Sequence, residues 1–307
     1  MISVVFPAYN EEDNIAELHR RLVGALSTLN TPFEIVAVND ASQDKTLEVL
    51  RGLAPIRVVT LASRSGQSSA LDAGIHAARG DVIITLDADL QNDPNDIPRM
   101  YHKLQAGYDA VVGWRQGRKD PLSRKIFSMV ANIVARRVLG LDIHDHACAL
   151  KMFKREFLAD VHLYGEMHVF LAAILHYRGA RLAEMPVAHH ERRSGLSKHN
   201  FIKGIKDLAD LFTIRFLFST SRPLLLFGTA ALISWAVAGA AVASAVALKV
   251  LDLRNFAQTP LPVIASLFII LGFILVMGGF LAELVLRVYY EGRDKTHYRV
   301  REIIENN

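Results

Sequence analysis

Two charge-free stretches near the C-terminus constrain this 307-residue chain more than any other feature. Residues 224–248 and 262–282 contain no charged side chain. Each is long enough to cross the hydrocarbon core of a bilayer, which requires about 20 apolar residues. Two buried helices of a soluble bundle are the competing interpretation, but such helices rarely lack charge over this length. We therefore predict two transmembrane helices, at about 224–248 and 262–286.

Basic residues flank these stretches unevenly. The loop between them offers only Lys249 and Arg254, whereas the outer flanks carry Lys203, Lys206, Arg215 and Arg222 on one side and Arg287, Arg293, Lys295, Arg299 and Arg301 on the other. Because basic flanks remain in the cytoplasm, we expect both termini to be cytoplasmic. The net charge is +4, and its concentration near the spans favours membrane lipid, not nucleic acid, as the partner.

The first 115 residues alternate between short apolar runs and segments with apolar residues at helical spacing. The runs lie at about 2–6, 33–38, 56–61, 82–86 and 108–113. Strands separated by helices indicate parallel βαβ units with right-handed crossovers. The sequence therefore predicts an α/β domain with a mostly parallel sheet.

Polar residues follow each of the first four predicted strands, and two carboxylates follow the fourth. The carboxyl ends of parallel strands meet at one edge of a sheet, where ligands bind. Asp87 and Asp89 repel each other when both are ionised, and a divalent cation makes their proximity favourable. Oxygen ligands select Mg²⁺ or Mn²⁺ over zinc. A solvated pair of aspartates at a strand end is the alternative.

Other ligand-binding patterns are absent or incomplete. The chain contains neither Gly-x-Gly-x-x-Gly nor a P-loop, so phosphates would be held by a metal ion and side chains. His144-x-His146-x-Cys148 lacks the usual spacing of zinc ligands, and His189-His190 is interpreted as a structural pair. The single cysteine, Cys148, permits no internal disulfide and is typical of a reducing compartment.

Five motifs occur in order along the chain: Pro7-x-Tyr9-Asn10-Glu11-Glu12, Asn39-Asp40-x-Ser42-x-Asp44-x-Thr46, Asp87-x-Asp89-Leu90-Gln91, Asp145-x-x-Cys148 and Arg192-x-x-Gly195-x-Ser197-Lys198. Together they resemble the inverting family 2 glycosyltransferases of GT-A fold. Within these, the chain is similar to polyprenyl-phosphate glycosyltransferases, including bacterial undecaprenyl-phosphate glucosyl- and aminoarabinosyl-transferases and dolichol-phosphate mannose synthase. The resemblance covers nearly the whole chain.

The resemblance implies a role for each matching residue. The donor nucleotide would contact Pro7, Tyr9, Glu11, Asp40, Ser42, Arg64, Gly66, Asp87 and Ala88, with Asp40 at the base. Asp87 and Asp89 would hold Mg²⁺ or Mn²⁺ and the diphosphate. The catalytic residues would be Asp89, Gln91 near the sugar, and Asp145 as base or positioning group. A loop aspartate that bonds local backbone is the alternative for Asp145.

A lipid phosphate acceptor requires cations close to the membrane. Arg192, Arg193, Ser197 and Lys198 are the predicted acceptor-phosphate residues, with arginine suited to bidentate phosphate binding. A solvated basic stretch attracted to lipid headgroups is the alternative. The chain also departs from the family pattern, because Ala41 and Ala149 stand where glycine is usual and Ser63-Arg64-Ser65-Gly66 replaces an Arg-Asn-aromatic-Gly pattern.

The predicted reaction is one in-line displacement that moves a sugar from a nucleotide-diphosphate donor to polyprenyl phosphate. The second pKa of the acceptor phosphate is about 6 by analogy with phosphoserine, so it needs little help from a base near neutrality. A UDP-sugar is the favoured donor, and GDP-mannose is the alternative. A membrane-anchored nucleotide-sugar binding protein without turnover is the rival from another class. A processive polysaccharide synthase is disfavoured, since two spans make a poor channel and Gln-x-x-Arg-Trp is absent.

The predicted domain organisation follows from these elements. Residues 1–198 would form the glycosyltransferase domain, 199–222 a juxtamembrane amphipathic helix, 223–286 the two spans and 287–307 a cytoplasmic tail. A further amphipathic helix is predicted at 124–139. The resemblance implies a homotetramer in the inner membrane, with the catalytic domain on its cytoplasmic face.

Overall fold

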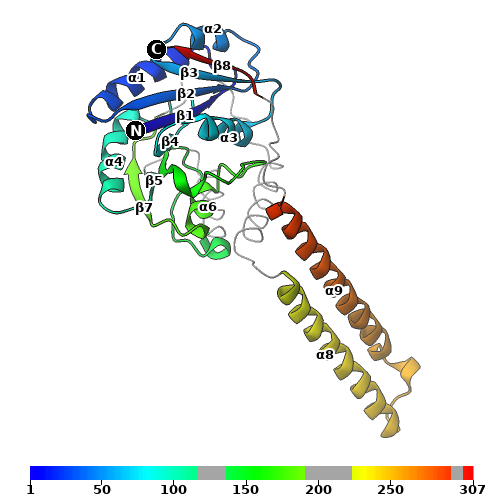
Figure 1. The fold of residues 1–307 in the computed structure, drawn as a ribbon. Helices are drawn as coiled ribbons and strands as arrows, with labels where there is room; N and C mark the ends of the chain where they lie inside the picture. Colours follow the sequence, from blue (N-terminus) through cyan, green and yellow to red (C-terminus); the bar gives the residue numbers. More distant parts are fainter. Residues whose placement is uncertain (117–135, 191–222, 292–299, 307) are drawn as a thin grey trace. The chain divides into compact units, whose positions relative to one another are not determined.

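The computed structural model describes residues 1–116, 136–190, 223–291 and 300–306 (Figure 1). These residues belong to two compact units. One contains the described residues up to His190 together with 300–306, and the other contains 223–291.

The described strands of the first unit form one eight-stranded sheet in the order β7-β5-β6-β4-β1-β2-β3-β8. Their bounds are β1 (Ile2–Ala8), β2 (Phe33–Asn39), β3 (Ile56–Leu61), β4 (Val82–Thr85), β5 (Ala110–Arg115), β6 (Lys151–Lys154), β7 (Leu182–Val187) and β8 (Val300–Asn306). Strands β1 to β4 are mutually parallel where they pair, and β5 is parallel to β7. Only β6 and β8 pair antiparallel to their neighbours. The predicted α/β fold with a mostly parallel sheet is confirmed.

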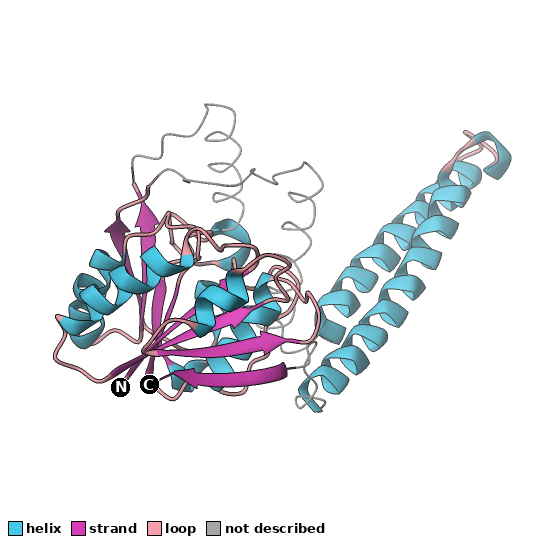
Figure 2. Ribbon diagram, turned by 90° about the horizontal axis from the view of Figure 1, so that it is seen from above, coloured by secondary structure: helices cyan, strands magenta, loops and turns pink. Residues whose placement is uncertain are grey.

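Helices cover both faces of this sheet (Figure 2). They are α1 (Ile15–Ser27), α2 (Thr46–Arg51), α3 (Gln67–Ala77), α4 (Ile97–Gln105) and α6 (Leu171–Tyr177), with short 3-10 turns η1 (Pro94–Asp96) and η2 (Arg155–Phe157). On β1, Val4 and Phe6 belong to the core cluster that contains α1 and α4, whereas Val5 belongs to the cluster that contains α3 and α6. Successive strand residues point to opposite faces, so both faces are buried and the strands are apolar throughout.

Three strands were not predicted from the sequence. Strand β6 has four residues with a lysine at each end, yet Lys151 is only 2% exposed. It lies between β4 and β5, so the fifth predicted strand is not adjacent to the fourth. Strand β7 contains Pro186 and half-buried residues, and β8 is largely exposed. None of these strands shows the continuous apolar run by which the other five were recognised.

The sequence predicts a separate cytoplasmic tail at 287–307, but residues 300–306 belong to the sheet. Residues 300–306 form β8, which pairs with β3 at the edge of the sheet. Glu305 contacts Arg57 at 3.2 Å and Arg79 at 2.7 Å, and Glu302 contacts Arg51 at 2.8 Å. The strand is held by backbone pairing and by charges more than 220 positions away in the chain, so no local pattern identifies it. The α/β unit therefore includes residues 300–306.

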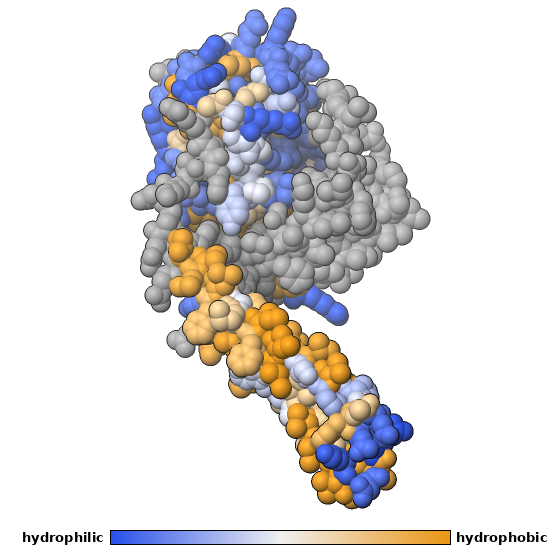
Figure 3. Space-filling model, turned by 90° about the vertical axis from the view of Figure 1, so that its right-hand side faces the viewer, coloured by the Kyte–Doolittle hydropathy of each residue, from blue (hydrophilic) through white to orange (hydrophobic). Residues whose placement is uncertain are grey.

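The second unit is a hairpin of two helices, α8 (Pro223–Val250) and α9 (Leu261–Glu291), joined by a loop that contains η3 (Phe256–Gln258). Residues Pro223–Val250 and Leu261–Val285 have mean hydropathies of 2.0 and 2.7, and both are long and apolar enough to cross a membrane. Figure 3 shows an apolar surface along them and hydrophilic residues at their turn. Both predicted spans are thus present as helices. Helix α8 and the start of α9 lie within two residues of the expected bounds, and α9 continues five residues beyond 286.

Small residues allow close approach of the two helices at some positions in this hairpin. A Cβ atom on Gly272 would lie 2.0 Å from Nε1 of Trp235, and one on Gly279 would lie 2.9 Å from Phe227. A Cβ atom on Gly228 or Gly239 would have no described atom within 4 Å, so these two glycines are not points of close helix approach among the described residues. Ser234 Oγ and Trp235 Nε1 donate to carbonyl oxygens of α9 at 2.7 and 3.2 Å.

Gly74→Ala is expected to destabilise the protein by about 1–3 kcal/mol through overpacking. Gly74 lies where α3 crosses β1 and β2, and an added Cβ would meet Val5 at 2.3 Å and Val38 at 2.8 Å. Gly24→Ala in α1 is the matched control, since nothing lies within 4 Å, and it should stabilise by about 0.5–1 kcal/mol. Thermal unfolding of both variants checks this. Equal shifts would contradict the close packing of α3.

Candidate active site

Parallel pairing brings the ends of several strands to one edge of the sheet. Ala8 of β1 is in register with Asn39 of β2, and Val5 of β1 with Thr85 at the end of β4. Strand β5 is antiparallel to β6, which is antiparallel to β4, so β5 ends at the same edge as β4. The loops after β1, β2, β3, β4, β5 and β7 therefore share this edge, where ligands bind in open α/β sheets.

The loops after β1 and β2 are hydrogen-bonded to each other. The backbone N–H of Asn10 donates to Ser42 Oγ at 3.1 Å, and its side-chain Oδ1 accepts from Gln43 N at 2.8 Å. The N–H of Glu11 donates to Thr46 Oγ1 at 2.8 Å. Glu11 and Ser42, both predicted to bind the donor, are thereby held side by side.

A second contact joins the loops after β1 and β3. The guanidinium of Arg64 lies over the ring of Tyr9, with Cζ 4.1 Å from the ring centroid. Pro7 precedes this tyrosine within β1 and is in register with Val38 of β2. The structure thus brings the predicted donor residues Tyr9 and Arg64 together, two positions after Pro7, so that an aromatic face and a cation lie in contact.

The carboxylate of Asp40 is bound to the start of helix α3. Asp40 is 4% exposed, and its Oδ1 and Oδ2 accept hydrogen bonds from the backbone N–H groups of Ser65 at 2.7 Å and Gly66 at 2.9 Å. Gly66 has a φ of +91°, which glycine adopts without strain. Asp40 therefore joins the loop after β2 to the loop after β3, a structural role that the sequence did not indicate.

Three residues of this edge adopt left-handed backbone conformations. Asn10, Ala41 and Leu90 have φ values of 56°, 53° and 61°, and each lies in the loop after β1, β2 or β4. The conformation costs an L-residue with a Cβ atom roughly 1–2 kcal/mol. Ala41 stands where the resemblance has glycine, which explains the family preference at this position. Such strain is characteristic of functional loops.

Asp87 and Asp89 follow β4 directly at this edge. Oδ1 of Asp87 accepts a hydrogen bond from Nε2 of Gln67, the first residue of α3, at 2.7 Å. Asp89 is 4% exposed, and its Oδ1 accepts from the N–H of Gln91 at 3.2 Å. Ala88 between them is buried. The side-chain atoms that this turn offers to a metal ion are carboxylate oxygens. Mg²⁺ and Mn²⁺ prefer such ligands, so Asp87 and Asp89 fit either ion.

Gln91 connects this turn to the segment that follows β7. Its carbonyl oxygen accepts from the N–H of His190 at 2.8 Å, and its Nε2 donates to the carbonyl of His190 at 3.4 Å. His190 Nε2 also lies 3.0 Å from Asp93 Oδ2, and Asn92 pairs with His189 in an isolated bridge. The two histidines are therefore bound to the turn of Gln91, in agreement with a structural pair.

Asp145 forms a two-pronged ion pair with Arg115, the last residue of β5. Arg115 Nε donates to Oδ2 at 2.7 Å and Nη2 to Oδ1 at 2.8 Å, and Asp145 is 5% exposed. Burial alone would lower the pKa of the Arg115 guanidinium, but its bond to Asp145 raises this pKa above its ordinary value. The side-chain partner of Asp145 thus lies thirty positions away in the chain. Asp145 is therefore not a loop aspartate that bonds only local backbone. The sequence analysis missed Arg115, although its place after the fifth apolar run was a signal.

Buried ionisable groups lie next to this pair. Burial raises the pKa of the Cys148 thiol to about 11. Burial, followed by the charge of Lys151, lowers the pKa of His146 to about 4. Burial also lowers the pKa of Lys151, whose Nζ donates to the carbonyl oxygens of Cys148 and His168. Cys148 and His146 are therefore neutral near pH 7.

The structure does not assemble a zinc site from His144, His146 and Cys148. His144 Nδ1 lies 2.7 Å from Glu184 Oε2, and its ring stacks on Trp114 with centroids 4.4 Å apart. Cys148 contacts Asn92 and the carbonyl of Leu150 instead. His146 and Cys148 both lie near Asp145 and Lys151, whereas His144 is bound to Glu184.

Several predicted residues lie outside the described part of the chain. These are the acceptor-phosphate residues Arg192, Arg193, Ser197 and Lys198, the predicted juxtamembrane helix at 199–222, and most of the predicted helix at 124–139. The strand that leads toward the first group, β7, ends at the same edge as β4 and β5.

Residues 3–161 match the model of a protein family described as glycosyl transferase family 2. The match covers half of the chain, and the chain belongs to this family. The predicted family is thereby confirmed, and the protein is a glycosyltransferase.

Curated relatives extend the similarity over the whole chain. A dodecaprenyl-phosphate galacturonate synthase of Rhizobium johnstonii is 34% identical over 99% of this chain and 93% of its own length. An undecaprenyl-phosphate 4-deoxy-4-formamido-L-arabinose transferase of Edwardsiella ictaluri is 34% identical over 100% of this chain and 95% of its own length. These alignments span the residues of the two C-terminal helices as well as those of the α/β unit.

Solved structures confirm the GT-A fold. Glucosyl-3-phosphoglycerate synthase of Mycobacterium tuberculosis, in complex with Mn²⁺, uridine diphosphate and phosphoglyceric acid, superposes with a TM-score of 0.54 at 21% identity, over 70% of this chain and 78% of that one. A fragment of S. aureus TarS in complex with UDP-GlcNAc gives a TM-score of 0.51 at 19% identity, over 70% and 66% of the two chains.

Arg115→Ala is expected to destabilise the protein by about 3–5 kcal/mol, because it leaves the buried carboxylate of Asp145 without its cation. Arg115→Met with Asp145→Leu should cost less than Arg115→Ala alone, since neither charge remains. Thermal unfolding gives the free energies. Arg20→Ala is the control, with 71% of the arginine side chain exposed in its pair with Glu17, and it should change little. A double variant as unstable as Arg115→Ala would contradict this explanation.

Stability should fall when the pH is lowered through the range from about 6.5 to about 4, in part because of His146. In this range the unfolded chain binds a proton at His146 that the folded protein does not. This difference lowers the free energy of unfolding by about 3 kcal/mol at most. The melting temperature of His146→Gln should therefore decline less between pH about 7 and about 4.5 than that of the unmodified protein. His102→Gln, at an exposed site, should follow the unmodified protein. Identical declines in all three would refute the assignment.

Proposed function

We propose that this glycosyltransferase moves a sugar from a nucleoside-diphosphate donor, a UDP-sugar by preference, to a polyprenyl phosphate. One observation carries the proposal. Relatives named as polyprenyl-phosphate sugar transferases are about one-third identical over the full chain, including its two apolar helices. The edge with Asp87, Asp89 and Asp145 supplies the groups that such a transfer requires.

The donor would bind at the loops after β1, β2 and β3. The nucleoside would contact Pro7, Tyr9, Glu11, Ser42 and Arg64, beside the junction of Asp40 and Gly66. The Tyr9 ring and the Arg64 guanidinium form a preassembled face for a base, because they already lie 4.1 Å apart. The main role of Asp40 would be to fix the start of α3, since both of its carboxylate oxygens accept backbone hydrogen bonds.

Asp87 and Asp89 would hold Mg²⁺ or Mn²⁺ together with the donor diphosphate, beside Ala88. Such an ion supplies electrostatic stabilisation of the negative charge that develops on the leaving diphosphate. Gln67 fixes the orientation of Asp87, and the N–H of Gln91 fixes that of Asp89. Gln91 would approach the sugar from a turn that is anchored to His190.

Asp145 would position the acceptor and take a proton from it when the phosphate is singly charged. A phosphate with a second pKa of about 6 is largely deprotonated near neutrality, so no strong base is needed. Arg115 keeps the carboxylate in one orientation with two hydrogen bonds. Attack from the face opposite the diphosphate inverts the anomeric centre, so an α-linked donor gives a β-linked lipid product.

The membrane arrangement completes the proposal. The two apolar helices would anchor the enzyme in the inner membrane with both termini cytoplasmic, as the basic flanks indicate. Arg192, Arg193, Ser197 and Lys198 would bind the acceptor phosphate at the membrane surface. A homotetramer remains the expected assembly by resemblance. Residues 1–198 together with β8 would form the catalytic domain.

Purified protein should form an organic-soluble sugar lipid from undecaprenyl phosphate, Mn²⁺ or Mg²⁺ and one of a set of radiolabelled UDP- and GDP-sugars. Asp89→Asn should reduce the rate at least about 100-fold, the usual effect of losing one charge-stabilising group. Asp81→Asn is the matched control, since Asp81 lies just before the same strand at its other end and is 83% exposed.

The donor screen separates the alternatives. A product from GDP-mannose only would replace the UDP-sugar proposal. Nucleotide-sugar binding without product from any donor would favour the non-catalytic binding protein. Equal rates in Asp89→Asn and Asp81→Asn would refute the proposed metal site.

A further inference from the structure

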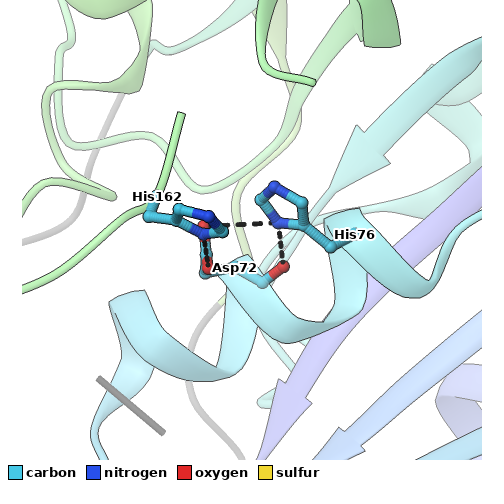
Figure 4. A group of neighbouring side chains, drawn as sticks. All are labelled: Asp72, His76 and His162. Carbon is cyan, nitrogen blue, oxygen red and sulfur yellow. Dashed lines mark hydrogen bonds and ion pairs between the residues drawn. The ribbon is translucent and has the colours of Figure 1, made fainter. Parts of the chain in front are cut away.

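A second group of possible metal ligands lies on helix α3, away from Asp87 and Asp89. Asp72 and His76 are four residues apart on this helix and thus share one face, and His162 comes from the segment between η2 and α6 (Figure 4). One ligand atom from each of the three residues lies within 4.8 Å of the other two. At about 1.5 Å per residue, Asp72 is about 7.5 Å along the helix axis from Gln67, which contacts Asp87.

The carboxylate of Asp72 is buried next to these two imidazoles. It is 1% exposed, and its Oδ1 accepts from Leu163 N at 2.7 Å. His162 Nδ1 lies 2.9 Å from Oδ2, and His76 Nδ1 lies 3.5 Å from Oδ1 and 2.9 Å from the backbone oxygen of Asp72. Within the described part of the chain, no lysine or arginine contacts this carboxylate. A buried negative charge is stabilised by hydrogen bonds such as that from Leu163 and by a nearby positive charge.

One protonated imidazole could supply that charge, whereas protons on both imidazoles would be unfavourable. The rings of His76 and His162 are stacked, with centroids 4.5 Å apart and planes inclined by 21°. Two imidazolium ions face to face would repel each other at this distance. A single divalent cation would more than neutralise the carboxylate and leave both rings neutral, which is the protonation state in which imidazole binds metals.

We propose that Asp72, His76 and His162 form a site for a divalent transition-metal ion, with zinc as the best match. Two imidazole nitrogens and one carboxylate oxygen are a ligand set typical of Zn²⁺, and a water molecule would complete its tetrahedron. The side chains of His76 and His162 are 27% and 25% exposed, so an ion can enter from solvent. Small side-chain rotations would bring the ligand atoms to bonding distance.

The site would join helix α3 to the segment that contains His162. These elements already touch at a second point, where Ser68 Oγ lies 2.8 Å from His168 Nδ1. With three protein ligands instead of four, the ion would be exchangeable, unlike a closed structural zinc. Zinc would therefore stabilise α3, the helix whose first residue orients Asp87, without taking part in sugar transfer.

Co²⁺ is the direct probe, since its visible absorption reports nitrogen ligation and tetrahedral geometry. The experiment uses the full-length protein in detergent, purified without a polyhistidine tag and freed of metal by a chelator that is then removed. Excess Mg²⁺ is present throughout, so that it occupies the oxygen ligands of Asp87 and Asp89. One equivalent of Co²⁺ should give visible bands that Zn²⁺ abolishes.

His162→Gln and His76→Gln should each lose these bands, whereas His102→Gln, at an exposed site of α4, should keep them. Saturating Zn²⁺ should raise the melting temperature of the unmodified protein and of Asp89→Asn by about 5 °C, and should not raise that of His162→Gln. Unmodified protein without bands would overturn the proposal, whatever the variants do. Bands that persist in both histidine variants would also overturn it, as would a zinc shift lost in Asp89→Asn.

Discussion

The parallel pairing of β1 with β2 and β4 is the constraint on which the rest of the structure depends. It brings the loops after these strands to one edge, where the left-handed residues Asn10, Ala41 and Leu90 all occur. Because both faces of the sheet are buried under helices, polar chemistry can be placed only at the strand ends. The same arrangement gives the loops a rigid base, so side chains such as Asp87 and Asp89 keep their positions.

Buried carboxylates occur at both edges of the sheet, but their surroundings differ. At the start of β5, Asp109 pairs with Lys154 at 2.6 Å and Arg181 at 3.0 Å, and these cations hold the pKa of Asp109 well below its usual range. The loops after β1, β2 and β4 lie at the opposite edge. The ion pairs of Asp109 with Lys154 and Arg181 therefore only link β5, β6 and β7. At the other edge, Asp145 and Arg115 lie among the loops that we propose to bind the donor. A perturbed pKa therefore indicates a functional group only together with its location.

Much of the fold could be predicted because its signals are local. Five strands are continuous apolar runs bounded by polar residues, and the helices between them have regular apolar spacing. Strands β6 and β8 lack such runs, and Arg115 was missed because its partner Asp145 lies thirty positions further along the chain. Asp87 and Asp89, the proposed metal pair, were predicted from a strand end alone. The partners that orient it, Gln67 and the N–H of Gln91, could be identified only from the structure.

The sequence by itself determined the two apolar helices, the α/β class and the family, since each depends on length, periodicity or motif order within short segments. The tertiary structure decided the pairing of Arg115 with Asp145, the return of the C-terminal strand to β3, and the meeting of Asp72 with His162. These contacts join residues 30, more than 230 and 90 positions apart. Their energy comes from charge and backbone pairing across the folded core, and neither leaves a periodic pattern in the chain.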